Sequence, residues 1–197
     1  MKRLGLRWLA MLAACLTLLS GCATSYLLDS HVLAFSSLPT LPANPSYRFE
    51  RLPSQQQLPV QAHIEALADP ALHRAGLRRD DAAPNYSVMV TARIQRVLSP
   101  WADPWDWGWG GGLMYGGPGF GHPAPFMRMQ QAWFQREVAV IVRELASGRV
   151  VFESRAANDG PWLDNNLVLT TMFDAALQGF PNTPTGPRRV GIPLGAR

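Results

Sequence analysis

Apolar and polar positions alternate most clearly over residues 86–95. Apolar side chains stand at the even positions of this stretch, and mostly polar side chains stand between them. A period of two predicts a β-strand with one buried face. Residues 134–145 alternate in the same way and are followed, after a turn at Gly148, by a second β-rich stretch, residues 149–155. Two such stretches around a glycine turn predict a hairpin.

A short strand and a helix are predicted before this region. Residues 47–52 alternate apolar and polar side chains, which is typical of a strand. From Val60 to Leu72, apolar side chains recur every three to four positions, which is the spacing of one helix face. Asp69-Pro70 falls inside this repeat, so we expect the helix to kink there or to restart for a last turn that ends at Gly76.

A second helix is predicted near the end of the apolar pattern. Between Leu169 and Phe180, apolar side chains again recur at the spacing of one helix face. Asp164 or Asn165 is the candidate N-cap of this helix. Residues 182–197 are rich in proline and glycine and carry no apolar repeat, so we expect a disordered tail there.

Residues 1–21 have the pattern of an export signal. Three basic residues precede an apolar stretch, residues 8–19, that is too short to span a bilayer. The run Leu19-Ser20-Gly21-Cys22 that follows resembles the lipobox of bacterial lipoproteins. The resemblance implies cleavage before Cys22, acylation of its sulfur and of its freed amine, and, because Ala23 rather than aspartate follows, attachment to the outer membrane. The alternative is an ordinary cleaved signal with an incidental cysteine.

Removal of this signal changes what the composition implies. The 18 Lys and Arg against 14 Asp and Glu become 15 against 14, so the net charge does not indicate a nucleic-acid partner. The two cysteines are Cys15, which leaves with the signal, and Cys22, which carries the lipid. The exported domain therefore has no disulfide and relies on its hydrophobic core. That domain is predicted over residues 46–181, and residues 22–45 are either a tether or an edge strand.

Residues 101–125 combine aromatic side chains with a density of glycine that neither a helix nor a sheet core tolerates. They are predicted to form a long loop between two strands, and loops of this length are usually functional or disordered. An aromatic loop suits contact with sugar rings, a lipid interface or a partner protein. The alternative is a low-complexity insertion whose tryptophans fold back on the sheet. The candidate binding residues are Trp101, Trp105, Trp107, Trp109, Tyr115 and Phe120.

No motif for catalysis, a metal or a cofactor is complete in this sequence. The four histidines, His31, His63, His73 and His122, lack the spacing of metal ligands, and no glycine motif leads into a helix to hold a nucleotide. Asp103 and Asp106 resemble the paired carboxylates of a glycosidase, but such a pair needs rigid support. We therefore expect no enzyme. The remaining charged residues are expected on solvated faces or in cross-strand ion pairs: Glu65, Asp69, Arg136, Glu137, Arg143, Glu144 and Arg155.

Four short motifs resemble the DUF4136 family of bacterial lipoproteins. They are Tyr47-Arg48-Phe49, Ile64-Glu65-Ala66-Leu67 through Gly76, Pro84-Asn85-Tyr86-Ser87-Val88, and Met172-Phe173-Asp174-Ala175-Ala176-Leu177 through Phe180-Pro181. The resemblance covers roughly residues 25–181 and implies no known activity and no catalytic residues. It implies an α+β domain with a small mixed, mostly antiparallel sheet packed against two helices, from which the long Gly/Trp-rich loop projects.

The function expected from these features is that of a lipid-anchored protein of the outer membrane that faces the periplasm. It would act without catalysis, by binding or by supporting the envelope. One alternative is a glycan- or peptidoglycan-binding module that uses the tryptophan loop. A second is a hydrolase centred on Asp103, Asp106 or His122. The expected partners are the membrane, through the anchor, and an envelope protein or glycan.

Membrane attachment is predicted to depend on Cys22. In the Cys22→Ser variant no thiol accepts the lipid, and no segment after the signal is long and apolar enough to replace it. We expect this variant to be a soluble or uncleaved periplasmic product when cells are fractionated. Mature Cys22→Ser protein that stays in detergent-resistant association with the outer membrane would contradict the prediction.

Overall fold

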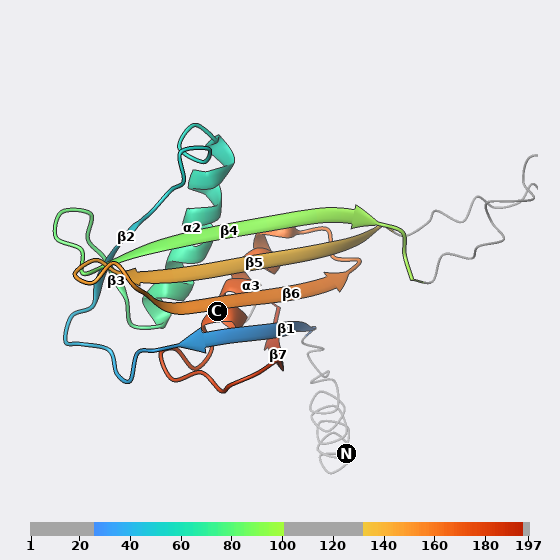
Figure 1. Ribbon diagram of the computed structural model, residues 1–197. Coiled ribbons are helices and arrows are strands. Elements are labelled where there is room, and N and C mark those ends of the chain that lie inside the picture. The colour runs from blue at the N-terminus through green and yellow to red at the C-terminus, as the bar shows by residue number, and fades with distance from the viewer. Residues whose placement is uncertain (1–25, 101–131, 195–197) are drawn as a thin grey trace, which may run out of the picture.

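The computed structural model describes residues 26–100 and 132–194, which form one seven-stranded sheet and two helices (Figure 1). The predicted α+β class is therefore confirmed, whereas the Gly/Trp-rich loop lies outside the described residues. The order of strands across the sheet is β3-β2-β4-β5-β6-β1-β7. In chain order the elements are β1 (Leu27–Ser36), β2 (Ser46–Phe49), α2 (Pro59–Arg74), β3 (Arg78–Arg79), β4 (Tyr86–Val97), β5 (Trp133–Glu144), β6 (Val150–Gly160), α3 (Asn165–Leu177) and β7 (Arg188–Pro193).

The centre of the sheet is the antiparallel group β4, β5 and β6. β4 and β5 pair over their whole length, from Tyr86 opposite Glu144 to Val97 opposite Trp133. β5 and β6 form the predicted hairpin, in which Gly148 has a positive φ of 69° that suits glycine in a tight turn. The sheet is mixed because β2 pairs in parallel with both β4 and β3.

Both helices lie against one face of the sheet, and the core fills the space between them. Phe173 and Met172 of α3 are fully buried there, as are Ala68 and Leu72 of α2. The helices run side by side in the same direction, since contacts join both their first turns and their last turns. The opposite face of the sheet carries no helix among the described residues (Figure 1). We call it the uncovered face.

The two helices confirm the predicted N-cap of α3 but not a restart within α2. The Asp164 side chain accepts a hydrogen bond from the Leu167 backbone N–H at 3.0 Å, which confirms Asp164 as the N-cap of α3. α2 does not restart at Asp69-Pro70 but continues through it to Arg74. The Asp69 carboxylate accepts a hydrogen bond from the Tyr47 hydroxyl, so it bonds across to β2.

Two predictions about the ends of the domain need correction. The predicted disordered tail, residues 182–197, contains strand β7, which pairs with β1 and buries Val190. Only one deeply buried side chain marks this strand, which is too little to form a visible repeat in the sequence. Residues 27–36, left open as tether or edge strand, form β1, and β1 is not an edge because it lies between β6 and β7.

Two charged residues expected on solvated faces or in cross-strand ion pairs are buried, and neither is paired across strands. Glu65 is 4 % exposed, and the Arg51 guanidinium donates to both of its carboxylate oxygens at 2.6 Å. Arg136 is 2 % exposed and makes its hydrogen bonds to Asn165 and to the carbonyl of Trp162. Hydrogen bonds of this kind compensate the loss of water that makes the burial of a charge costly.

We predict that Phe173→Ala destabilises the domain by about 3–5 kcal/mol, because a fully buried ring leaves a cavity when it is removed. Phe35→Ala is the matched control. Its ring is 64 % exposed on the uncovered face, so we expect a change within about 0.5 kcal/mol. Urea unfolding of both variants measures the difference. Equal effects would show that the α3 face is assigned wrongly.

Tyr47 is predicted to make the stability of the domain depend on pH above neutrality. Burial, together with the hydrogen bond to Asp69, raises the pKa of Tyr47 above its ordinary value of about 10. The folded protein thus favours the neutral phenol, so this contribution to stability is present below pH of about 10 and is lost as the pH rises further.

The Tyr47→Phe variant tests this pH dependence. It is expected to lose about 0.5–1.5 kcal/mol at pH 7 with the hydrogen bond to Asp69, and to decline less steeply than the wild type between pH 9 and 11. Tyr86, whose pKa is also raised by burial, remains in both proteins and cancels in the comparison. Parallel curves of unfolding free energy against pH would contradict the assignment.

Candidate functional site

The candidate site residues of the sequence analysis lie outside the described residues. This holds for Cys22, for the six aromatic residues of the loop, and for Asp103, Asp106 and His122. Of the other histidines, His31 is exposed on the uncovered face, and His63 is hydrogen-bonded to Asn166. Within residues 26–100 and 132–194, no group of three or more His, Cys, Asp or Glu side chains could hold a metal ion.

A shallow groove of about 340 Å³ lies on the sheet, toward the end where β4 finishes and β5 begins. Four strands supply its walls, and most of its side chains are polar. The residues that line it are His31, Arg93, Gln95, Gln135, Arg136, Glu137, Ala157, Asn158 and Asp159. We call it the polar groove.

Strand register explains why these side chains meet. Arg93, Glu137, Ala157 and His31 stand directly opposite one another on β4, β5, β6 and β1. Gln95, Gln135 and Asp159 form the next row on the same face, two residues further along each strand. The methyl group of Ala157 is much shorter than its neighbours Glu137 and His31. The surface is therefore hollowed between them.

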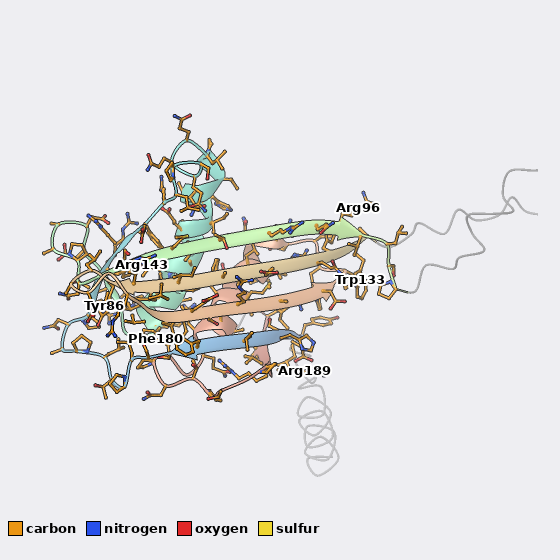
Figure 2. The ribbon with its side chains drawn as sticks, in the orientation of Figure 1. Tyr86, Arg96, Trp133, Arg143, Phe180 and Arg189 are labelled. Carbon is orange, nitrogen blue, oxygen red and sulfur yellow. The ribbon has the colours of Figure 1, made fainter. Side chains whose placement is uncertain are left out.

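At one end of the polar groove a tryptophan fixes the position of a carboxylate. The Trp133 indole Nε1 donates a hydrogen bond to Asp159 Oδ2 at 3.0 Å. Trp133 is half-buried at the start of β5, and Figure 2 labels it at the end of the sheet where β4 finishes. The groove thus combines a fixed carboxylate with two amides and an exposed guanidinium, Arg93.

Arg136 lies beneath the groove with its side chain on the helix side of the sheet. Its Nε and Nη2 donate to Asn165 Oδ1 at 3.0 and 2.8 Å, and its guanidinium stacks 4.9 Å from the centre of the Phe134 ring. Burial lowers the pKa of Arg136. No described carboxylate forms an ion pair with it. These bonds fix the start of α3 against β5, which keeps the groove floor in place.

A second feature of the uncovered face is apolar. Leu33 and Phe35 of β1 are 54 % and 64 % exposed. In their rows the next side chains, on β6, are Arg155 and Glu153, which form an ion pair, and the half-buried apolar side chains lie beyond these on β5 and β4: Ala139, Ile141 and Met89. Leu33 and Phe35 stand two residues apart on the same face of β1, and exposed apolar side chains that lie together in this way are typical of interaction surfaces.

Chemically, the polar groove can bind but carries no recognisable catalytic set. Its amides and its arginine donate hydrogen bonds, and its carboxylates accept them, which suits a ligand rich in hydroxyl or amide groups. The groove could not be predicted from the sequence, because its exposed residues occupy the polar positions of alternating strands, a pattern typical of a solvated face. Only the register between strands brings them into common rows.

Neither helix among the described residues is long and apolar enough to cross a membrane. None of the curated proteins matches the sequence. Among solved structures, the chain is similar to the PelC dodecamer from Paraburkholderia phytofirmans, with 13 % identity, a TM-score of 0.47 and coverage of 75 % of this chain and 94 % of that chain.

Two further structures are similar to the chain. A PDZ domain protein from Parabacteroides distasonis has 11 % identity, a TM-score of 0.47 and coverage of 85 % and 39 % of the two chains. A minor lipoprotein from Acinetobacter baumannii has 11 % identity, a TM-score of 0.34 and coverage of 68 % and 87 %. These similarities identify neither a ligand nor an activity. The family model for a domain of unknown function, DUF4136, matches residues 31–182, which is more than half of the chain, and the protein therefore belongs to the DUF4136 family.

Proposed function

We propose that the protein is a lipid-anchored binding protein of the bacterial outer membrane that faces the periplasm and acts without catalysis. The anchor is Cys22, and the binding surface is the uncovered face of the sheet. The observation that carries the proposal is the composition of that face. It presents a polar groove and exposed apolar side chains together.

The support for the anchor comes from the sequence and from where the sheet begins. The lipobox-like run ends at Cys22, and the first described residue, Tyr26, is only four residues further on. A lipid at Cys22 would therefore hold the folded domain close to the bilayer. Acyl chains contribute about 0.8 kcal/mol for each buried methylene, so several chains would make attachment stable.

The support for binding comes from the uncovered face. Antiparallel sheets often leave one face to water, but such a face is usually polar throughout. Here Leu33 and Phe35 are more than half exposed beside the polar groove. The combination is typical of interaction sites, which join an apolar contact with a few directed polar groups.

A glycan is the second candidate, as the ligand of the same face. The amides of Gln95 and Gln135, with Arg93 and Asp159, offer both donors and acceptors for hydroxyl groups. Trp133 stands at the edge of the groove and is fixed by its bond to Asp159. In this form of the proposal the tryptophan loop, residues 101–125, adds aromatic contacts to the groove. A hydrolase would instead depend on Asp103 or Asp106.

Site-specific photo-crosslinking in intact cells tests the proposal. A photoreactive residue at position 135 reports on the polar groove, and one at position 62 is the matched control, because Ala62 is exposed on α2. We expect several times more adduct from position 135, and we expect Arg93→Ala with Gln95→Ala to remove it, since two groove contacts are lost. Mass spectrometry identifies the adduct, and a muropeptide supports the glycan candidate.

Two results would contradict the proposal. Equal adduct yields from positions 135 and 62, or adducts that persist in the Arg93→Ala/Gln95→Ala variant, would show that the groove is not a binding site. Turnover of a glycan by the purified protein, lost with Asp103→Asn or Asp106→Asn, would show that the protein is an enzyme.

A further inference from the structure

Four strongly exposed apolar side chains gather at one end of the domain. Leu163 is 76 % exposed, Leu98 65 %, Tyr26 63 % and Leu27 54 %. They come from three separate segments, namely the start of β1, the residue after β4 and the loop between β6 and α3. We call this set the apolar rim. Exposed large apolar side chains scattered singly need no explanation, but a set gathered from three segments does.

The topology brings these segments to the same end of the sheet. Val97 at the end of β4 is opposite Trp133 at the start of β5, and Phe134 is opposite Gly160 at the end of β6. β1 is antiparallel to β6, so it begins where β6 ends (Figure 1). The four strands thus place the apolar rim and Trp162 around the end of the domain at which Figure 2 labels Trp133.

Contacts between these segments hold the rim in shape. The Tyr26 ring meets the edge of the Trp162 ring, with 5.7 Å between their centres. The carbonyl of Trp162 accepts a hydrogen bond from Arg136 of β5. Leu163, the next residue, is therefore carried by a loop that is fixed to both β1 and β5. These contacts fix the part of the rim formed by Tyr26 and Leu163, and Leu98 directly follows the last paired residue of β4.

The rim lies close in the sequence to the proposed lipid anchor. Cys22 precedes Tyr26 by four residues, and four residues span at most about 14 Å when fully extended. If Cys22 carries acyl chains, the end of the domain that bears the rim is the end nearest the lipid. The opposite end of the sheet is the turn around Gly148. The last two residues of β5 before that turn, Arg143 and Glu144, are charged.

We propose that the apolar rim rests on the bilayer that holds the lipid anchor, so that the domain docks on the membrane as well as being tethered to it. This inference rests on the proposed lipid anchoring at Cys22. The occupant is the phospholipid surface, into whose headgroup region leucine, tyrosine and tryptophan side chains partition.

Charge does not drive this docking. The exposed arginines toward this end are matched by exposed carboxylates: Arg93, Arg96 and Arg189 stand against Asp29, Glu137, Asp159 and Asp164. Apolar contact is therefore the main attraction, and it is only weakly screened by salt. Docking is expected to be as strong on neutral phosphatidylcholine vesicles as on vesicles that contain anionic lipid.

A depth measurement with a single fluorescent label tests docking. Cys15 leaves with the signal and the Cys22 sulfur is acylated, so a cysteine introduced into the full chain is the one free thiol. Leu163→Cys places an environment-sensitive dye on the rim. Leu58→Cys is the matched control, because Leu58 is 49 % exposed before α2. The acylated proteins are reconstituted into phosphatidylcholine vesicles that contain a brominated lipid, which quenches only nearby dyes.

We expect the dye at position 163 to be quenched several times more strongly than the dye at position 58, with little change between low and high salt. Adding Leu98→Glu should reduce the quenching at position 163, whereas Leu52→Glu should not, since Leu52 is exposed away from the rim. Both leucines are exposed, so the thermal midpoint should stay the same in both variants.

The outcomes separate the inference from the anchor on which it rests. Equal quenching at positions 163 and 58 in acylated protein overturns docking and leaves the anchor intact. The mass of the purified chain shows whether Cys22 is acylated. If it is not, the proposed anchor fails, and the measurement is repeated with Cys15→Ser and Cys22→Ser added, so that the introduced cysteine is again the one free thiol. Selective quenching of position 163 by added vesicles would then support docking through the rim, whereas its absence would overturn docking as well.

Discussion

The fold depends on burying the apolar face of α3 against the sheet. Phe173 and Met172 are fully buried there, and each such side chain contributes about 1.5–3 kcal/mol relative to exposure. A hydrogen bond also fixes the position of α3 on the sheet, because the Ser154 hydroxyl of β6 donates to the Ala176 carbonyl at 2.7 Å. Since the uncovered face has no second layer among the described residues, the face covered by α3 and α2 is where the sheet buries its apolar side chains. Burial of that face favours the observed strand register over a shift by one residue, and the groove on the other face depends on the same register.

Periodic patterns allowed the centre of this structure to be predicted from the sequence. The strands β4 and β5 and the helix α3 each repeat their apolar residues often enough for the period to be read, and Asp164 follows a local capping rule. β6 has no such repeat, and its first half was predicted from the β-rich residues after the glycine turn. The parallel pairing of β2 with β4 follows no such rule. A four-residue strand has too few positions to show which neighbour it joins, and its partner is set by the path of α2.

Charged residues were the main source of error, for a physical reason. Glu65 looks like a surface residue because carboxylates are rarely buried without a partner, and its partner Arg51 lies fourteen residues away across a loop. Arg136 is buried by the loop before α3, which approaches β5 only in the folded chain. The polar groove escaped notice for the same reason. Arg93, Glu137 and His31 become neighbours only through strand pairing, while the predicted loop site lies outside the described residues.

The two edges of the sheet have a consequence for how copies of this chain behave when many are confined to one surface. On one side the sheet ends in β3, which has only two residues, both arginine. On the other side it ends in β7, which begins with Arg188-Arg189 and finishes at Pro193, a residue without a backbone N–H. Short, basic or proline-ended strands are poor templates for a further strand. Crowded copies can therefore approach one another without joining their sheets into an aggregate.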